Sequence, residues 1–386
     1  MMNDLKLLEQ AQGQELILQN APGDFLKKYA AGRSAVFIGG KGSLLNGALD
    51  EFKEAVPGAE VFSGIEAEPS TETVEKMTAF LDEGRFDTVF ALGGGSVLDA
   101  AKAAYLVNQT KLPLRELFGV NMYSNKFPGR TLKRIIALPT TSGTGSEATQ
   151  YSNIVDRSAK VKKLIAEKEC VPLAGCIVPR YAATMPREVT LATGCDVLAH
   201  LLEGFLNVGA DGNHPEANNW ALTGIRLVKN FLPQALEKDP EAVKMMACAA
   251  ALGGMTIRFK STGLPHLCSF SWFGRIPHGI AAIMLLPESW LYYLGNPAVA
   301  ERTMLLKEIF PGKTPEEVIG SFREFLTELG VPQKLNVFKD LSLELMELTA
   351  SSAGENKMKL ELAPRPVPVE QSKLILQNIL LKSYGE

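Results

Sequence analysis

Asp196 and His200 lie four residues apart in the stretch GCDVLAHLLEG, residues 194–204. In a helix, residues at this spacing project from the same face about one turn apart, so a carboxylate and an imidazole converge on one point. Two interpretations are open: the pair helps to hold a metal ion, or it forms a surface hydrogen bond or weak ion pair. The pair alone does not decide between them.

Histidine is scarce in this chain, which has four. His266 and His278 stand at the two ends of LPHLCSFSWFGRIPHG and could complete a mononuclear site begun by Asp196 and His200. One carboxylate and three imidazoles suit Fe(II) or Zn(II) better than Mg(II), and they leave an open position for a substrate oxygen. Because no cysteine belongs to the set, a purely structural zinc is disfavoured. The remaining histidine, His214, stands in the polar stretch DGNHPEA and is expected to be a solvated surface residue.

Two glycine-rich stretches could bind phosphate. ALGGGSVLDAAKA, residues 91–103, leads from an apolar strand through three glycines into a helix whose first turn contains Ser96 and Asp99. Glycines let backbone N–H groups approach a ligand closely, and the dipole at a helix start favours a phosphate. LPTTSGTGSEAT, residues 138–149, adds hydroxyls that suit contacts to a nicotinamide, ribose or phosphate. Each stretch, taken alone, also fits an ordinary structural turn.

The elements that must position these residues differ between the two halves of the chain. Up to residue 185, short apolar runs bounded by glycine alternate with amphipathic stretches, as in βαβ units around a parallel sheet. The apolar runs are 34–40, 59–65 and 87–95, and the amphipathic stretches are 42–56, 71–84 and 96–107. From residue 186 on, longer amphipathic helical segments prevail. We therefore predict an α/β nucleotide-binding domain over residues 1–185 and a helical domain over residues 186–386.

Composition argues against several classes of function. A chain of 386 residues is long enough for two domains, and 40 Lys and Arg against 43 Asp and Glu provide no basic field for nucleic acid or an anionic membrane. The N-terminal stretch lacks the apolar run of a secretory signal, and no later run is expected to span a membrane. The five cysteines are scattered without CxxC spacing, which fits reduced thiols in a protein core. A soluble, cytoplasmic protein is expected.

Together the motifs resemble the iron-containing alcohol dehydrogenase family over nearly the whole chain. The stretches that carry the resemblance are GGGSVLDAAKA, ALPTTSGTGSEAT, KVKKLIA, TGCDVLAHLLEGF and the segment from His266 to PHGIAAIMLLP. The resemblance implies an α/β dinucleotide-binding domain followed by an all-α metal-binding and substrate domain, an architecture shared with dehydroquinate synthase. It also implies a homodimer or a higher homo-oligomer.

The same resemblance assigns roles to residues of this chain. It makes Asp196, His200, His266 and His278 the ligands of an Fe(II) or Zn(II) ion, which polarises the oxygen of a small alcohol or aldehyde. Hydride then moves between the substrate and NAD(H) or NADP(H). The cofactor contacts implied are Gly94, Gly95, Ser96, Thr140, Thr141, Thr144 and Lys162, to which the glycine-rich helix start adds Asp99.

The turn in AVFIGGKGSLLNG bears on the choice of cofactor. NAD-preferring relatives usually carry an acidic residue here, which bonds the ribose hydroxyls and repels a 2′-phosphate. This chain instead has Gly39, Gly40, Lys41 and Ser43, whose backbone amides, ammonium and hydroxyl can bind an added phosphate. We predict a preference for NADP(H), with use of NAD(H) also possible.

Three residues bear on the substrate. Arg258 and Lys260 stand where many relatives have small or apolar residues, and either could bind a phosphonate, sulfonate or carboxylate. The other interpretation is a solvated helix face or an ion pair. Phe270 stands where many members carry a proton-relay histidine, so we expect it to help form a different substrate pocket. HLCSF and TTSGTGSEATQYS also resemble the branch that reduces small anionic aldehydes such as phosphonoacetaldehyde.

Other functions remain open at this point. The chain could be a general short-chain alcohol dehydrogenase for neutral substrates, or a dehydroquinate synthase-like lyase or polyol-phosphate dehydrogenase. A nucleotide-hydrolysing module predicts a GxxxxGK[ST] pattern, which the sequence lacks. A catalytically silent relative is disfavoured because all four candidate ligands are present.

Overall fold

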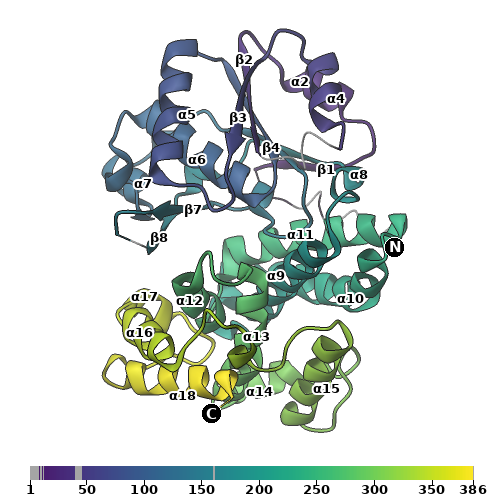
Figure 1. The fold of residues 1–386 in the computed structure, drawn as a ribbon, viewed down its shortest axis with the longest axis vertical. Coiled ribbons are helices and arrows are strands. Elements are labelled where there is room, and N and C mark those ends of the chain that lie inside the picture. The colour runs from purple at the N-terminus through teal and green to yellow at the C-terminus, as the bar shows by residue number, and fades with distance from the viewer. Residues whose placement is uncertain (1–7, 9–10, 12, 40–45, 160, 386) are drawn as a thin grey trace. The chain divides into compact units, whose positions relative to one another are not determined.

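A computed structural model describes residues 8, 11, 13–39, 46–159 and 161–385 (Figure 1). These residues divide into two compact units. The first comprises the chain up to Arg187 together with Lys238–Met255, and the second comprises Glu188–Glu237 together with the chain from Thr256 onward. The sequence placed a single boundary after residue 185, whereas this division also assigns Lys238–Met255 to the first unit.

The first unit is built on a six-stranded sheet whose strands pair in parallel, in the order β1-β9-β6-β4-β2-β3. Its strands are β1 (Glu15–Leu18), β2 (Ser34–Gly39), β3 (Glu60–Ile65), β4 (Thr88–Gly93), β6 (Ile136–Pro139) and β9 (Ala174–Ile177). The central strands β2 and β4 are almost entirely buried, because a parallel sheet is covered on both faces. The predicted strands at 34–40, 59–65 and 87–95 correspond to β2, β3 and β4.

Helices cover the two faces of this sheet (Figure 1). Phe37 and Ala91 point toward α5 (Thr71–Gly84) and α6 (Gly95–Thr110), whereas Val36 and Phe90 point toward α2 (Gly23–Tyr29) and α4 (Ala48–Ala55). Successive strand residues thus feed two separate cores, as the alternation of side chains along a strand requires. The predicted α/β architecture of the N-terminal part is confirmed.

A second, three-stranded sheet was not predicted. It consists of β5 (Gly119–Val120), β8 (Val161–Ala166) and β7 (Tyr151–Asp156), in that order. The pair β7 and β8 is antiparallel and brings Val155 opposite Lys162. This sheet therefore places Lys162, a predicted cofactor contact, within the first unit.

The second unit consists of helices and turns throughout its described residues. Its α-helices are α9 (Arg187–Leu206), α10 (Ala217–Leu236), the end of α11 (Pro240–Lys260), α12 (Leu264–Ser269), α13 (His278–Tyr293), α14 (Pro297–Met304), α15 (Pro315–Glu328), α16 (Leu343–Ala353), α17 (Lys357–Glu361) and α18 (Ser372–Tyr384). The short 3-10 turns η5 (Val208–Asn213), η6 (Phe270–Trp272), η7 (Leu335–Val337) and η8 (Val369–Gln371) join some of them. The predicted helical C-terminal part is confirmed.

Two helices, α9 and α11, have the length and apolar composition of a membrane span, which the sequence analysis did not expect. Most of each helix is buried inside the protein, as is typical of core helices. The five cysteines are all free and buried, so their predicted role as core residues is confirmed.

Candidate active site

Helix α9 positions Asp196 and His200. Apolar residues occur all round this helix and bury it, so both polar side chains are taken out of water: Asp196 is 4% and His200 6% exposed. His200 Nε2 lies 3.8 Å from Asp196 Oδ1, as the spacing of four residues predicts. The alternative of a surface pair is wrong, because neither side chain is at the surface.

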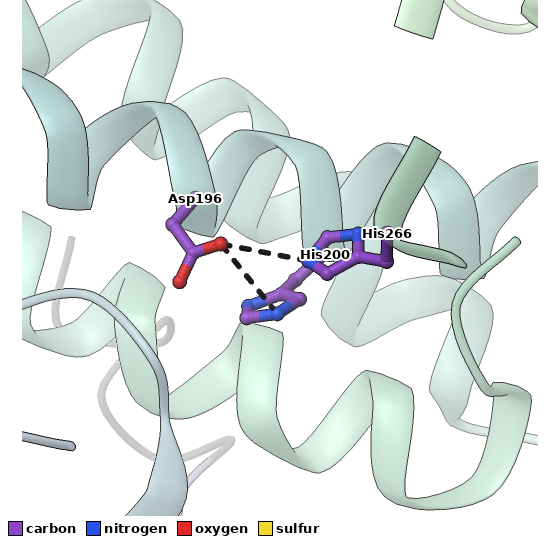
Figure 2. Close-up of side chains that lie close together, drawn as sticks. All are labelled: Asp196, His200 and His266. Carbon is purple, nitrogen blue, oxygen red and sulfur yellow. Dashed lines mark ion pairs between the residues drawn. The ribbon is translucent and has the colours of Figure 1, made fainter. Parts of the chain in front are cut away.

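His266 and His278 approach the same carboxylate from two other helices. His266, on α12, places Nε2 3.5 Å from Asp196 Oδ1, and its ring stacks on that of His200 with centroids 4.6 Å apart. His278 is the first residue of α13, directly after Pro277, and its Nε2 lies 3.8 Å from the same oxygen. Figure 2 shows the Asp196 carboxylate and the imidazoles of His200 and His266 directed toward one another. The structure thus brings all four predicted ligands together.

The chemistry of this cluster fits a divalent metal ion. Asp196 Oδ1, His200 Nδ1 and His266 Nε2 are buried and have no hydrogen-bond partner among the described residues. Buried polar atoms are normally paired, and the unpaired Asp196 Oδ1 and His266 Nε2 lie 3.5 Å apart, an arrangement that fits a bound cation. The potential ligand atoms of Asp196, His200 and His266 lie within 4.8 Å of one another. One carboxylate with imidazoles matches the preference of Fe(II) and Zn(II).

Burial and mutual charge shift the pKa values of these groups. Burial lowers the pKa of His200 to about 4, despite the opposing effect of Asp196. Burial also acts to lower the pKa of His266, but the negative charges of Glu203 and Asp196 outweigh it and raise this pKa to about 9. Burial acts to raise the pKa of Asp196, but the surrounding imidazoles outweigh it and hold this pKa well below its usual range. The site therefore strongly favours a negatively charged Asp196.

Two residues that support the histidines were missed by the sequence analysis. Glu203 is fully buried on α9, and its Oε1 lies 2.5 Å from His266 Nδ1. Ser269 donates to the carbonyl oxygen of His266, and its hydroxyl also lies 3.3 Å from His278 Nδ1. A signal for Glu203 was present: it follows His200 by three residues and so shares its helix face. Ser269 had no comparable signal.

Phe270 follows α12 and lies against the histidine cluster. Its ring is nearly parallel to that of His278, with an interplanar angle of 8° and centroids 5.5 Å apart. The predicted association of Phe270 with a substrate pocket stays a prediction. What the structure shows is that the aromatic ring packs against one of the four candidate ligands.

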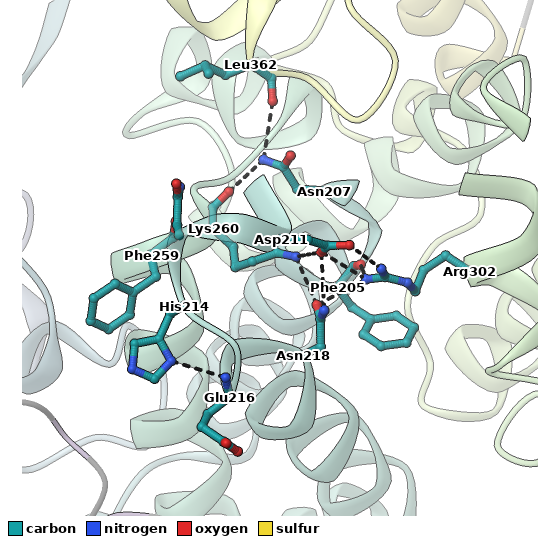
Figure 3. A network of polar contacts seen from close by, with 11 residues as sticks. Phe205, Asn207, Asp211, His214, Glu216, Asn218, Phe259, Lys260, Arg302 and Leu362 are labelled. Carbon is teal, nitrogen blue, oxygen red and sulfur yellow. Dashed lines mark hydrogen bonds and ion pairs between the residues drawn. The ribbon is translucent and has the colours of Figure 1, made fainter. Parts of the chain in front are cut away.

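Lys260 and Arg258, the two candidate anion-binding residues, have different surroundings. The Lys260 side chain is fully buried, and its ammonium forms an ion pair with Asp211 and donates to Asn218 Oδ1 at 2.9 Å. Arg302 joins the same network, with Nη2 2.6 Å from Asp211 Oδ2 (Figure 3). Arg258 is half-buried and lies over the ring of Phe259, 5.1 Å from its centroid. Of the two interpretations of Lys260, the structure shows the ion pair.

The expectation that His214 is a solvated surface residue is wrong. This side chain is 6% exposed, and the centroid of its ring lies 4.6 Å from those of both Trp220 and Phe259. Figure 3 shows His214 beside Phe259. Its Nδ1 accepts the backbone N–H of Glu216 at 3.2 Å. The polar sequence around His214 concealed its burial, because Trp220 is six residues further on and Phe259 lies in a distant segment of the chain.

The predicted cofactor-binding residues of the first unit form two adjoining segments. The glycine-rich turn opens α6, with Gly94 at its N-cap, and the hydroxyl-rich loop lies beside it. A Cβ on Gly94 would lie 3.2 Å from Thr141 Oγ1, and one on Gly95 would lie 2.7 Å from Thr144 Oγ1. A Cβ at Gly95 would force Thr144 to move, and one at Gly94 would be tightly packed against Thr141. The buried Ser142 hydroxyl has no partner among the described residues. The exposed amides of a helix start beside several hydroxyls fit the diphosphate of a dinucleotide.

The other predicted cofactor contacts lie around these segments. Ser96 Oγ accepts the N–H of Glu68 at 3.2 Å, and Lys162 Nζ lies 3.3 Å from Glu68 Oε1. Thr140 donates its N–H to the carbonyl oxygen of Gly93 at 3.0 Å, which joins the loop to the end of β4. The structure therefore places Ser96 and Lys162 beside a common acidic residue.

Asp99 holds the loop in place through its carboxylate. Oδ1 accepts from the Ser146 hydroxyl at 2.7 Å, and Oδ2 accepts from the N–H of Asn153 at 2.9 Å. The fully buried ammonium of Lys102, one helical turn further on, donates to the carbonyl oxygens of Ser146 at 2.6 Å and Thr149 at 3.0 Å. Lys102 was not predicted, although GGGSVLDAAKA places it three residues after Asp99.

The turn used to predict NADP(H) is described only in part. Gly39 ends β2, and a Cβ on it would lie 2.4 Å from Val97 Cγ2, so this glycine lets β2 approach the start of α6. Gly40, Lys41 and Ser43 lie outside the described residues. The prediction for these three residues therefore rests on the sequence.

Two family descriptions match the chain in succession. Residues 18–177 match the iron-containing alcohol dehydrogenase family, and residues 190–380 match the C-terminal domain of the Fe-containing alcohol dehydrogenase family. Together they include both candidate binding regions.

Individual alcohol dehydrogenases are also similar to this chain in sequence and in structure. An alcohol dehydrogenase of Thermococcus barophilus is 30% identical over 325 residues, which are 82% of this chain and 85% of that protein. An NADPH-dependent butanol dehydrogenase of Clostridium saccharobutylicum is 30% identical over 314 residues, 78% of each protein. The solved iron-containing alcohol dehydrogenase of Thermococcus thioreducens superposes with a TM-score of 0.85 at 28% identity, covering 97% of this chain and 99% of that one.

Sequence, fold and site lead to the same assignment. The family uses a metal ion and a nicotinamide cofactor, and its members are oxidoreductases that act on CH–OH groups. The chain belongs to the iron-containing alcohol dehydrogenase family.

Proposed function

We propose that this chain interconverts a small alcohol and its aldehyde with a divalent metal held by Asp196, His200, His266 and His278. The observation that carries the proposal is the convergence of the buried ligand groups of Asp196, His200 and His266, among which Asp196 Oδ1 and His266 Nε2 have no hydrogen-bond partner in the described residues. Such atoms are costly to bury, and a cation relieves that cost. Fe(II) or Zn(II) suits the donor set.

Each residue of the proposed site has its own role in binding the metal or the substrate. When bound, the metal supplies a Lewis acid for the substrate oxygen, and the nicotinamide exchanges hydride with the substrate carbon. Asp196 supplies the negative charge of the ligand set, while Glu203 and Ser269 hold His266 and His278 in orientation. Phe270, which lies parallel to His278, forms part of the substrate pocket in this proposal.

Metal content measured after reconstitution tests the ligand set. His266→Ala is expected to abolish retention of Fe(II) or Zn(II) and all turnover. His214→Phe is the matched control, because it removes another buried imidazole but keeps a ring between Trp220 and Phe259. It is expected to retain the metal and the activity. Undiminished metal content in His266→Ala would rule out the assigned ligands.

The cofactor is proposed to be NADP(H), with NAD(H) also accepted. Gly94, Gly95 and Ser96 would hold its diphosphate, with Thr140, Thr141, Thr144 and Lys162 beside it and Asp99 holding the loop. Lys41 and Ser43 would bind the 2′-phosphate, together with the backbone of Gly39 and Gly40. One relative at 30% identity is named as NADPH-dependent, which supports this choice. Replacing Lys41 with Asp and Ser43 with Ala should shift the ratio of kcat/KM values toward NADH; an unchanged ratio would refute it.

The substrate is proposed to be a small anionic aldehyde, such as phosphonoacetaldehyde, bound by Arg258. Neutral short-chain substrates are the second candidate. They are favoured because Lys260 is paired with Asp211 and so does not offer its charge to a substrate anion. Rates of NADPH oxidation with phosphonoacetaldehyde, sulfoacetaldehyde, succinic semialdehyde and neutral aldehydes decide between them. Arg258→Ala should lower kcat/KM for the anionic aldehydes alone. An equal loss of kcat/KM for neutral aldehydes would show that Arg258 does not bind the anionic group of the substrate.

The protein is further proposed to act in the cytoplasm as a homodimer or a higher homo-oligomer. This proposal follows from membership of the family. Light scattering coupled to size-exclusion chromatography measures the mass of the assembly, and a mass equal to the 41.9 kDa of a single chain would contradict it.

A further inference from the structure

Glu203 is a fully buried carboxylate next to the candidate metal ligands. It lies on α9, seven residues after Asp196 and three after His200, so all three share one helix face. Neither oxygen is left without a partner. Oε1 lies 2.5 Å from His266 Nδ1, and Oε2 accepts the backbone N–H of Gly263 at 2.6 Å.

This contact determines which nitrogen of His266 can bind a metal. A carboxylate only accepts hydrogen bonds, so the hydrogen of a neutral His266 ring resides on Nδ1, facing Glu203. The lone pair is then on Nε2, the atom that lies 3.5 Å from Asp196 Oδ1. A histidine with the opposite tautomer would turn an N–H group toward the ligand cluster.

We propose that Glu203 is a positioning residue that fixes the orientation and tautomer of His266 and thereby sets the affinity of the site for its metal. The inference rests on the proposed ligand set. Carboxylates that accept from the far nitrogen of a metal-binding histidine increase the basicity of that ligand as well as orienting it.

The ammonium of Lys359 braces the chain segment that Glu203 also contacts. Lys359 is 7% exposed and interacts with Glu203 through its charge. Its ammonium donates to Ser261 Oγ at 2.8 Å and to the carbonyl oxygen of Thr262 at 3.1 Å, in the segment that leads to Gly263.

A purely structural role for Glu203 makes a different prediction. Glu203 also anchors the start of α12, because it accepts the N–H of Gly263. The Tyr293 hydroxyl anchors the same helix start by accepting the N–H of Leu264 at 2.8 Å. In the described structure Tyr293 has no hydrogen bond to His266. Tyr293→Phe therefore removes one anchor of α12 but leaves the contact between Glu203 and His266. It is the matched control for Glu203→Gln.

The test measures metal affinity, which does not depend on turnover. Zn(II) is titrated into the metal-free, full-length wild type, Glu203→Gln and Tyr293→Phe in competition with a chromogenic chelator. Glu203→Gln removes the charge and leaves one acceptor oxygen for the two N–H groups of His266 and Gly263, so it is expected to bind about 10–100-fold more weakly. Tyr293→Phe is expected to bind like the wild type. The absorption spectrum of bound Co(II) reports whether the four ligands remain in Glu203→Gln.

Each result has a separate meaning. If Glu203→Gln binds Zn(II) as tightly as the wild type, or if Tyr293→Phe is weakened equally, the positioning role is wrong while the ligand set stands. If the wild type binds no Zn(II), or if His266→Ala binds Zn(II) as tightly as the wild type, the proposed ligand set itself is wrong. Should Glu203→Gln not fold, Glu203→Asp retains the charge but retracts it by one methylene, and the same loss of affinity is expected.

Discussion

The backbone of Gly279 lies directly against that of Ala192, so that a Cβ on Gly279 would be 2.0 Å from the Ala192 carbonyl oxygen and 2.8 Å from the Asp196 nitrogen. Gly279 follows His278 in α13, and Ala192 precedes Asp196 in α9. This close approach of two helix backbones therefore brings two candidate ligands together.

Gly279→Ala is expected to push α13 away from α9. It should lower the free energy of unfolding by about 1–3 kcal/mol, as overpacking does, and weaken Zn(II) binding through displacement of His278. Urea unfolding and metal titration measure the two effects. Gly320→Ala in α15 is the control, because nothing lies within 4 Å of its added Cβ, and it should stabilise by about 0.5–1 kcal/mol. Wild-type metal affinity in Gly279→Ala would contradict the role of this contact.

Replacing Lys102 should weaken cofactor binding as well as stability. Lys102→Met removes the donor shared by the carbonyl oxygens of Ser146 and Thr149, so the hydroxyl-rich loop loses one of its anchors to α6, and Asp99 provides the other. We expect a loss of about 3 kcal/mol in unfolding free energy and a higher Kd for NADPH. Lys126→Met removes an exposed ion pair with Glu116 and an exposed contact with the ring of Phe127, and it should change stability by less than about 1 kcal/mol. Fluorescence titration with NADPH measures the Kd of each variant. An unchanged Kd in Lys102→Met would show that Lys102 does not contribute to cofactor binding.

Asp211 should contribute stability that disappears in acid. Burial acts to raise the pKa of Asp211, but the hydrogen bonds from Arg302 and Lys260 outweigh it and lower this pKa from 3.8 to about 2. Because the folded-state pKa lies below the unfolded value, the contribution is complete at neutral pH and is lost as the pH falls through 3.8 toward 2.

Asp211→Asn tests this pH dependence. At pH 7 it should cost about 2 kcal/mol, less than a fully buried ion pair, because the Asp211 side chain is 39% exposed. The difference from the wild type should narrow as the pH is lowered from 4 to 2, as measured by urea unfolding. Glu241→Gln, in an exposed pair with Lys244, should show little effect at any pH. A difference that stayed constant down to pH 2 would disprove the charge-based explanation.

Metal removal should destabilise the folded protein reversibly. A ligand that binds only the folded state at 100 times its Kd adds about 2.7 kcal/mol to the free energy of unfolding. A chelator should therefore lower Tm, and Zn(II) should restore it in the wild type. His266→Ala should respond to neither addition. A chelator-insensitive wild-type Tm would mean that no tightly held ion supports the fold.

Local geometry explains what the sequence determined. The spacing of Asp196 and His200 fixed their common helix face, because helix periodicity depends only on neighbouring residues. Helix α5 spans Thr71–Gly84, as the amphipathic pattern predicts, and β2, β3 and β4 lie where the apolar runs indicate. The glycine-rich turn before α6 was predicted for the same reason.

Tertiary packing decided what the sequence left open. Glu203 and His266 are 63 residues apart, and Lys260 and Asp211 are 49 residues apart, so no local pattern pairs them. The same limitation concealed the burial of His214, whose neighbours along the chain are polar. Whether a charged side chain becomes a ligand support, an ion pair or a solvated group depends on what the folded chain packs against it, because burial removes water and makes a partner necessary. The sequence by itself determined the candidate ligands and the elements that carry them, and only the tertiary structure decided which polar groups contact those candidate ligands.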